Sequence, residues 1–421
     1  MFISLLLTLV AADTDSTFTI NGFTGVSGEI ITNSMTGSSI FFWQFDAYNG
    51  NITTDTRPLV IWNQGGPGCG SEIGLLLEGI APITVDQYGN AQNNPSSWNT
   101  RVHILSIDFP YDSGFSVALQ PEDLQNTTQS SVVYLYNFLI RLGQKYPTWF
   151  KRDVYWFGED YSGHFIPAIA SLILQNNAVA GNIVIPLKGI ALGNPWVDGS
   201  YQTQYYDMAA YNLGIINAQQ RSTIWNNQNN ILNYINQQNY TLAFNSWQFT
   251  LGQFESMTGN VNVYNTRTTS NMTFSNLVYF LNTPSIKTKV LNVPSSAIWA
   301  ACNSDVFYDF ENDFMLNFPT TMIPQLLGQL KVMIYHGIDD LYCNTLGLNQ
   351  WIKNLNWPYA SNFFQSRRGF WNVQGSIAGY AQTYSNLTYI QVLNAGQAVG
   401  FKQPYAFRDM AFRFIFNQGW N

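Results

Sequence analysis

The chain has 421 residues, of which 46% are hydrophobic and 16% aromatic, so it can bury a large core in one big domain or two ordinary ones. These proportions exclude a disordered protein. Only 10% of the residues are charged, and 18 Lys and Arg against 25 Asp and Glu leave a formal net charge of −7 without any basic run. That balance argues against nucleic acid as a partner.

The amino-terminal segment, residues 1–12, is an apolar stretch that ends in small residues and is followed by the polar sequence DTDST. This pattern predicts a secretory signal peptide, although no Lys or Arg precedes the apolar run. The alternative is a buried amino-terminal strand. No later stretch is long and uncharged enough to predict a transmembrane span.

Short apolar runs bounded by turn residues recur along the chain, and each predicts a buried strand. Helical patterns lie between several of them. Strands that alternate with helices favour an α/β fold, with a mostly parallel central sheet covered by helices on both faces. The predicted strands are Ile40–Phe45, Leu59–Trp62, Val102–Ile107, Val154–Phe157, Ile190–Leu192, Val332–Tyr335 and Ile390–Leu393, and the predicted helices are Ser130–Tyr146 and Pro167–Leu174.

From about residue 201 to 300 the strand signals thin out, and stretches rich in Asn, Gln and Tyr take over. No linker rich in Pro, Gly or Ser flanks this region, so we interpret it as an insertion that caps the carboxyl-terminal edge of the sheet. On this interpretation residues 13–421 form a single domain. A second, small domain is the alternative.

Asn-X-Ser/Thr sequons predict N-linked glycans, which fit a chain that enters the secretory pathway. Because the chain is rich in Asn, Ser and Thr, some sequons are also expected by chance. They lie at Asn51, Asn126, Asn239, Asn271 and Asn386.

The three cysteines, Cys69, Cys302 and Cys343, permit one disulfide and one leftover thiol. They are widely separated, with no C-x-x-C pair and no nearby histidine, which argues against a metal site. No motif points to a cofactor.

Two glycine-rich segments carry the candidate chemistry. Gly158–Gly163 follows a predicted strand and precedes a predicted helix, with Asp160 at the tip of the turn. Its spacing is that of a nucleophile elbow displaced by one small residue. The segment 62–71, WNQGGPGCGS, follows another strand, and its backbone N–H groups could point at a developing oxyanion.

Taken in order, the segments WNQGGPGCGS (62–71), GEDYSGHFIP (158–167) and IYHGIDDLYCNTLG (334–347) resemble the serine carboxypeptidase family, peptidase family S10. Lesser matches extend the resemblance over nearly the whole chain. It implies an α/β-hydrolase fold with a helical cap insertion. It also implies that Cys69 and Cys302 form the family's shared disulfide and that Cys343 is a buried thiol.

The same resemblance implies that two catalytic residues are replaced. The family's nucleophilic serine falls on Asp160 and its histidine on Gln397, whereas the triad acid is retained at Asp340. A glutamine side chain cannot relay a proton, so we expect hydrolysis to be lost. The oxyanion hole falls on the amides of Gly66 and Tyr161, and we expect the carboxylate of Asp160 to occupy it, because a helix amino terminus favours an anion.

Another histidine would be needed to replace the missing one. His103 is expected to be structural, and His164 matches a residue that the family has on the helix after the elbow. His336, four residues before Asp340, is the spare candidate. If the carboxylate of Asp160 were itself the nucleophile, histidine would still be needed to activate the water that cleaves the ester intermediate.

The family's site for the substrate's terminal carboxylate falls on Gln64, Gly65, Glu78 and Glu159, with Gln64 replacing an asparagine. Two close carboxyl groups cannot both ionise cheaply, so one of the glutamates should have a raised pKa. Either the pocket still binds peptide C-termini, or the two glutamates survive only as support for the elbow.

These observations predict a secretory-pathway glycoprotein, secreted or held in a lysosomal or vacuolar lumen. We expect it to have lost hydrolysis and to serve in binding or assembly, with peptide C-termini or a protein as the partner. One alternative is an active carboxypeptidase that acts on peptide C-termini. The other is a structural subunit of a larger complex.

Overall fold

The structure is a computed structural model that describes residues 13–420. The expected signal peptide, residues 1–12, lies outside the described residues. Within 13–420, none of the helices is both long and apolar enough for a membrane span.

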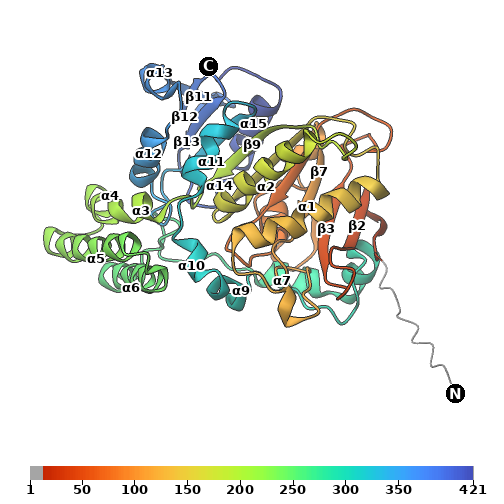
Figure 1. The fold of residues 1–421 in the computed structure, drawn as a ribbon, viewed down its shortest axis with the longest axis horizontal. Helices are drawn as coiled ribbons and strands as arrows, with labels where there is room; N and C mark the ends of the chain where they lie inside the picture. Colours follow the sequence, from red (N-terminus) through yellow and green to blue (C-terminus); the bar gives the residue numbers. More distant parts are fainter. Residues whose placement is uncertain (1–12, 421) are drawn as a thin grey trace.

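One large sheet forms the centre of the molecule, with its strands in the order β1-β2-β3-β7-β4-β8-β9-β10-β13-β12-β11 (Figure 1). The strands from β7 to β13 in this order are parallel, and antiparallel strands extend both edges. A small hairpin, β5–β6, stands apart. The bounds are β1 Ser16–Ile20, β2 Phe23–Ile31, β3 Ser39–Phe45, β4 Leu59–Asn63, β5 Ile83–Val85, β6 Ala91–Asn93, β7 His103–Ile107, β8 Val154–Glu159, β9 Leu187–Gly193, β10 Lys331–Gly337, β11 Arg368–Val373, β12 Ser376–Tyr384 and β13 Leu387–Val392.

Helices cover both faces of the sheet, so the side chains of a central strand are buried whichever way they point. In β8, Trp156 packs into the cluster that holds α1 and α2, whereas Tyr155 and Phe157 pack into the cluster that holds α15. Successive side chains of a strand alternate between its faces, so one short run of apolar residues supplies both cores. The bounds are α1 Thr128–Lys145, α2 Ser162–Asn177, α12 Thr345–Asn354, α13 Ala360–Gln365, α14 Val399–Lys402 and α15 Pro404–Ile415, with single turns η1 Ile73–Leu77, η2 Trp98–Thr100 and η3 Pro121–Asp123.

The predicted α/β architecture is confirmed, and each predicted strand coincides with an observed one to within a few residues. The second predicted helix begins earlier than expected, at Ser162 instead of Pro167, because α2 starts directly after the turn at Asp160. The outer strands β1, β2, β11 and β12 escaped prediction. They mix buried residues with partly or fully exposed ones, and glycines interrupt β2 and β12, so they lack the continuous apolar runs of the central strands.

Helices fill the segment between β9 and β10. α5 and α6 form an antiparallel pair, joined by hydrogen bonds from Asn227 to Gln253 (2.7 Å) and from Gln220 to the Met257 carbonyl (2.8 Å). With α4 they lie together at one end of the molecule (Figure 1). The helical region continues beyond residue 300, to the end of α11 at Leu326. Its bounds are α3 Gly199–Gln202, η4 Thr203–Tyr205, α4 Tyr206–Asn212, α5 Ala218–Asn236, α6 Tyr240–Thr258, α7 Ser275–Asn282, α8 Pro284–Ile286, η5 Lys287–Leu291, α9 Ser304–Asp309, α10 Glu311–Phe314 and α11 Pro319–Leu326.

A disulfide between Cys69 and Cys302 fastens this inserted region to the glycine-rich loop after β4, which confirms the predicted pairing. Backbone hydrogen bonds flank it, from Gly70 to the Ala301 carbonyl (2.9 Å) and from Asn303 to the Gly68 carbonyl (2.9 Å). Cys343 is free and buried. The covalent link and its two hydrogen bonds therefore hold the loop and the insertion in one fixed arrangement.

We predict that replacing both bridging cysteines, Cys69→Ser with Cys302→Ser, lowers the free energy of unfolding by about 2–5 kcal/mol, since the crosslink closes a very long loop. Urea unfolding of the two proteins measures the difference. As a control, alkylation of denatured, unreduced protein should label one thiol, and labelling after reduction should add two more. Three labelled thiols before reduction would contradict the assignment.

Candidate active site

The candidate site begins at the sharp turn between β8 and α2. Asp160 stands at its tip with a φ of 57°, a left-handed conformation that aspartate tolerates better than most residues. Its N–H donates to the Gly193 carbonyl (3.0 Å), and its carbonyl accepts from the N–H groups of Gly163 and Trp196 (2.9 Å each). Because both the backbone N–H and the backbone carbonyl of Asp160 are hydrogen-bonded, the turn presents the Asp160 carboxyl group in one fixed direction.

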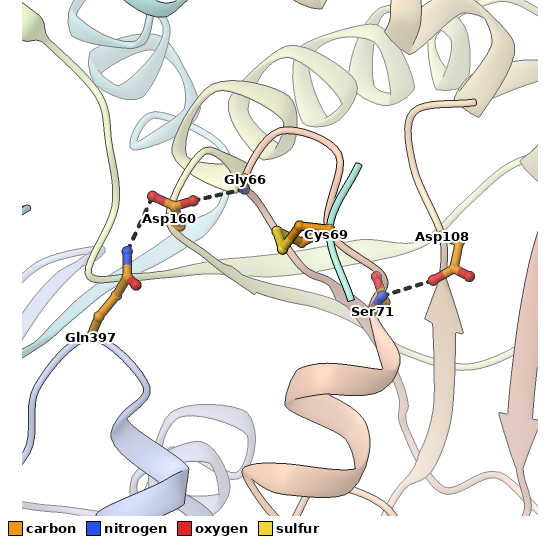
Figure 2. Close-up of a disulfide and its surroundings, with 7 residues drawn as sticks. Gly66, Cys69, Ser71, Asp108, Asp160 and Gln397 are labelled. Carbon is orange, nitrogen blue, oxygen red and sulfur yellow. Dashed lines mark hydrogen bonds between the residues drawn. A yellow bond between two sulfur atoms is a disulfide. The ribbon is translucent and has the colours of Figure 1, made fainter. Parts of the chain in front are cut away.

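The glycine-rich loop after β4 lies directly against this turn. A Cβ atom on Gly65 would stand 2.3 Å from the backbone nitrogen of Tyr161, so only glycine fits there. Gly66 has a φ of 119°, which also requires glycine. Farther along the loop, the Ser71 N–H donates to the Asp108 carboxylate (2.7 Å), which anchors the loop just beyond β7 (Figure 2).

The Asp160 carboxylate is held by hydrogen bonds at both oxygens. One oxygen accepts from the Gly66 N–H (2.7 Å), and the other accepts from the side-chain amide of Gln397 (3.2 Å), as Figure 2 shows. Gly66 and Tyr161 are the residues whose amides the family resemblance assigns to an oxyanion hole, and the expected contact with Asp160 is observed for the Gly66 amide.

Burial controls the ionisation of Asp160. The residue is 9% exposed, and burial raises the pKa of its carboxyl group to about 7, against the opposing effect of the Gly66 hydrogen bond. The group therefore changes charge near neutral pH.

Asp340, the expected triad acid, lies behind the turn and makes no hydrogen bond with Gln397 within the described chain. Its carboxylate accepts from the side chain of Asn194 (2.8 Å) and from the Cys343 N–H (3.3 Å). Burial raises the pKa of Asp340 to about 8, and the negative charge of Asp160 raises it further. A three-residue relay of hydrogen bonds therefore does not form.

The spare histidine does not complete the relay either. His336 is fully buried, and its ring nitrogens contact the Cys343 carbonyl (2.8 Å) and the Thr345 hydroxyl (3.1 Å) instead of Asp160. Burial lowers the pKa of His336 to about 4, so the imidazole is neutral over the physiological range. His336 acts as a support for the loop after β10.

The other two histidines are also buried supports. His103 contacts the Asp55 carboxylate (2.7 Å) and accepts from the Ala47 N–H (3.0 Å). His164 packs against the ring of Phe318, with centroids 4.6 Å apart.

The two glutamates of the expected carboxylate-binding site lie together. Glu78 accepts from the Gly400 N–H (3.0 Å), and Glu159 accepts from the Tyr335 hydroxyl (3.2 Å). Burial raises the pKa of Glu78 to about 7. Burial also raises the pKa of Glu159 well above its usual range, and the charge of Glu78 raises it further. The pair therefore holds a proton at acid pH.

Most of these residues line one cavity of about 740 Å³. Gln64, Gly66, Glu78, Glu159, Asp160 and Gln397 line it, whereas Gly65, Tyr161 and Asp340 lie behind its surface. The side-chain oxygen of Gln64 is buried without a hydrogen-bond partner, so this residue still offers an acceptor to a ligand. Within residues 13–420, no cluster of His, Cys, Asp and Glu has the arrangement of a metal site.

Sequence reasoning missed the opposite wall of this cavity. The inserted region supplies Glu255, Tyr264, Phe307 and Tyr308, and α14 supplies Lys402, a cation beside the acidic wall. Most of these residues sit in short helices or irregular segments without a motif of their own. The only available signal was the prediction that an insertion covers this edge of the sheet.

Comparison with known proteins identifies relatives over the full length of the described chain. The family model "Serine carboxypeptidase" matches residues 17–417. "Serine carboxypeptidase S10 family member 1" of Dictyostelium discoideum is 30% identical over 424 residues, covering 99% of each chain. "Serine carboxypeptidase-like 50" of Arabidopsis thaliana is 29% identical over 394 residues, covering 93% of this chain and 88% of its own.

A solved structure shows the same fold. It is Kex1(delta)p, described as a prohormone-processing carboxypeptidase from Saccharomyces cerevisiae. The TM-score is 0.83 at 24% identity, with 93% of this chain and 91% of that chain covered. This likeness shows that the present chain has the α/β-hydrolase fold.

The raised pKa values predict that stability falls as pH rises. A carboxyl group whose folded pKa lies above its unfolded value takes up a proton on folding, so its charging between about pH 4 and its folded pKa destabilises the protein. For Asp160, Glu78 and Asp340 this window ends at about 7, 7 and 8. We expect the free energy of unfolding, measured with urea, to decrease by a few kcal/mol from pH 5.5 to 8.

Asp160→Asn should flatten this decrease, because it removes one of the charging groups and the charge that raises the pKa of Asp340. Asp153→Asn, at an exposed carboxylate, is the matched control and should leave the slope unchanged. A stability that is flat or rises over this range would show that the carboxyl groups are not held protonated.

Proposed function

Since the chain belongs to the serine carboxypeptidase family, we propose that it is a member that has lost peptide hydrolysis and keeps its pocket for binding. The observation that carries this proposal is the hydrogen bond from the Gly66 N–H to the Asp160 carboxylate (2.7 Å). The Asp160 side chain accepts this hydrogen bond at the position where the carbonyl oxygen of a substrate would have to sit.

The chemistry of Asp160 and Gln397 supports this proposal. Acyl transfer by a triad needs a hydroxyl or thiol to attack and an imidazole to move its proton. Asp160 offers a carboxylate, and the amide of Gln397 cannot accept a proton and return it at any working pH. The Gln397 amide instead donates to Asp160 and holds it in place.

An enzyme that used the Asp160 carboxylate as its nucleophile is the main rival. It would form an acyl or alkyl ester on Asp160 and would need a base to activate the hydrolytic water. His336 is engaged with Cys343 and Thr345, and Asp340 with Asn194, so neither group faces the position of that water. The arrangement therefore favours a site that does not catalyse hydrolysis.

The binding role rests on the intact cavity. Burial raises the pKa values of Glu78 and Glu159, and the Gln64 side-chain oxygen and Lys402 line the cavity where a ligand could reach them. We infer that the ligand is the C-terminal segment of a peptide, held more tightly in acid, when the acidic wall is protonated, than at neutral pH.

The proposal places the protein in the secretory pathway, as a glycoprotein that is secreted or held in an acidic lumen. Four of the five sequon asparagines, Asn51, Asn126, Asn239 and Asn271, are exposed. Asn386 is half-buried, and its side-chain nitrogen donates to the Leu327 carbonyl (2.9 Å). Because a glycan would be attached at that nitrogen, Asn386 is the poorest acceptor of the set.

The proposal is tested by restoring both residues, Asp160→Ser with Gln397→His. We expect the unmodified chain and each single variant to be silent towards an amino-blocked dipeptide at pH 5, because a serine without a base, or a base without a nucleophile, cannot turn over. The double variant should exceed each single variant in kcat/KM by roughly 10³-fold or more. Multiple turnovers by the unmodified chain that Asp160→Asn abolishes would show that it is an active enzyme.

Binding is tested separately with a fluorescein-labelled hexapeptide and its C-terminal carboxamide, followed by anisotropy. Ionisation of Asp160 and Glu78 near pH 7 should repel a C-terminal carboxylate, so the free-acid peptide should bind on the order of tenfold more tightly at pH 5 than at pH 8. The carboxamide should show a smaller change, and Asp160→Asn should reduce the pH dependence. If neither peptide binds at pH 5, the two glutamates serve only to support the turn.

A further inference from the structure

A second cleft, of about 500 Å³, is lined by none of the residues that line the cavity around Asp160. α15 forms one wall through side chains three and four positions apart, which therefore share one helix face. Other walls come from the residues just before β7, the β11–β12 turn and the segment after α15. The lining residues are Thr100, Arg101, Val373, Gln374, Tyr405, Arg408, Asp409, Phe412 and Gln418, and we call this site the arginine cleft.

Two arginines of this cleft lack a carboxylate partner within the described chain. The Arg101 guanidinium lies over the ring of Phe416, 3.8 Å from its centroid, and 5.3 Å from that of Phe412, and it donates no hydrogen bond to the protein. Arg408 uses one nitrogen to bond the Pro95 carbonyl (2.8 Å) and lies 5.5 Å from the ring centroid of Tyr405. Stacking on aromatic rings restricts a guanidinium group while its N–H edge stays free to bind.

The single carboxylate that lines the arginine cleft is already neutralised. Asp409 accepts from the Arg413 guanidinium (2.5 Å) and from the Trp371 indole (2.8 Å). Among the residues that the structure describes, no carboxylate therefore balances the positive charges of Arg101 and Arg408 in the cleft, in a chain whose net charge is −7. Acidic residues outnumber basic ones in this sequence. We therefore expect two cations without acidic partners in one concave site to attract an anion from solution.

The shape of the two guanidinium groups indicates which class of anion the cleft can bind. The forked N–H groups of arginine match the oxygen spacing of phosphate and sulfate groups. The rings of Tyr405 and Phe412 line the same cleft and offer apolar walls to the rest of a ligand. The amides of Gln374 and Gln418 add polar groups at the rim.

We propose that the arginine cleft binds a small organic molecule that carries a tetrahedral oxyanion, a phosphate monoester or a sulfate ester. Arg101 and Arg408 hold the oxyanion, and Tyr405 and Phe412 pack against the organic group. This site is independent of the proposed loss of hydrolysis, since it uses different residues.

The test is isothermal titration of the full chain with phenyl phosphate, phenyl sulfate and inorganic phosphate in 0.15 M chloride. We expect saturable binding at one site with a Kd below about 1 mM for at least one ester, and tighter than for inorganic phosphate. Preference for one ester identifies which oxyanion the site selects. No saturation by either ester at about 10 mM, some tenfold above that limit, would overturn the proposal.

Variants assign the binding to the cleft. Arg101→Gln and Arg408→Gln should each raise the Kd by about tenfold or more, and Arg101→Lys should weaken binding because it loses the fork. Lys188→Gln, at an exposed cation elsewhere, is the control and should have no effect. Arg101 bonds only to aromatic faces, so its variants remain interpretable even if Arg408→Gln, which loses the bond to Pro95, fails to fold. Binding that Arg101→Gln leaves unchanged would refute the assignment.

Discussion

The close approach of the glycine-rich loop to the turn at Asp160 is the constraint on which the site depends. Gly65 has no room for a side chain because the Tyr161 nitrogen lies where its Cβ would be, and Gly66 adopts a φ of 119°. This approach aims the Gly66 N–H at the tip of the turn. The disulfide at Cys69 and the anchoring of Ser71 by Asp108 keep the loop from withdrawing. Whatever side chain stands at position 160 therefore meets a fixed hydrogen-bond donor, and a carboxylate satisfies that donor permanently.

The electrostatics of the site follow from the burial of carboxyl groups that form no ion pair with Lys or Arg in the described chain. Asp160, Glu78, Glu159 and Asp340 are all buried, and no Lys or Arg of the described chain forms an ion pair with any of them. His336 is held neutral and supplies no compensating charge. A buried carboxyl group in such surroundings remains neutral by keeping its proton. Bound protons thus neutralise these carboxyl groups in place of paired cations, so the charge of the pocket depends on the pH around the protein.

The sequence predicted those parts of the fold that are encoded locally. Central strands such as Leu59–Asn63 are buried on both faces and read as apolar runs, and the turn at Asp160 is marked by its glycines. Outer strands such as Phe23–Ile31 escaped prediction, because partly exposed residues and glycines break up their apolar pattern. The contact between Gln397 and Asp160 joins residues 237 positions apart, and only the family resemblance pointed to it. The arginine cleft gave no sequence signal at all, since Arg101 and Arg408 meet only through the packing of α15.

Asp160 and Gln397 are best understood as one unit. With Asp160 in place, one carboxylate oxygen is satisfied by Gly66, and the other needs a donor on the facing loop. Gln397 supplies that donor from an uncharged side chain. The contact therefore persists whether the Asp160 carboxyl group is ionised or protonated, because a protonated carboxyl group still has lone pairs that accept a hydrogen bond. A histidine there would bind an ionised Asp160 as a cation, and its contact would weaken as either group titrated. The amide therefore gives a site whose geometry is independent of pH although its charge is not, and that combination suits a binding pocket better than a proton relay.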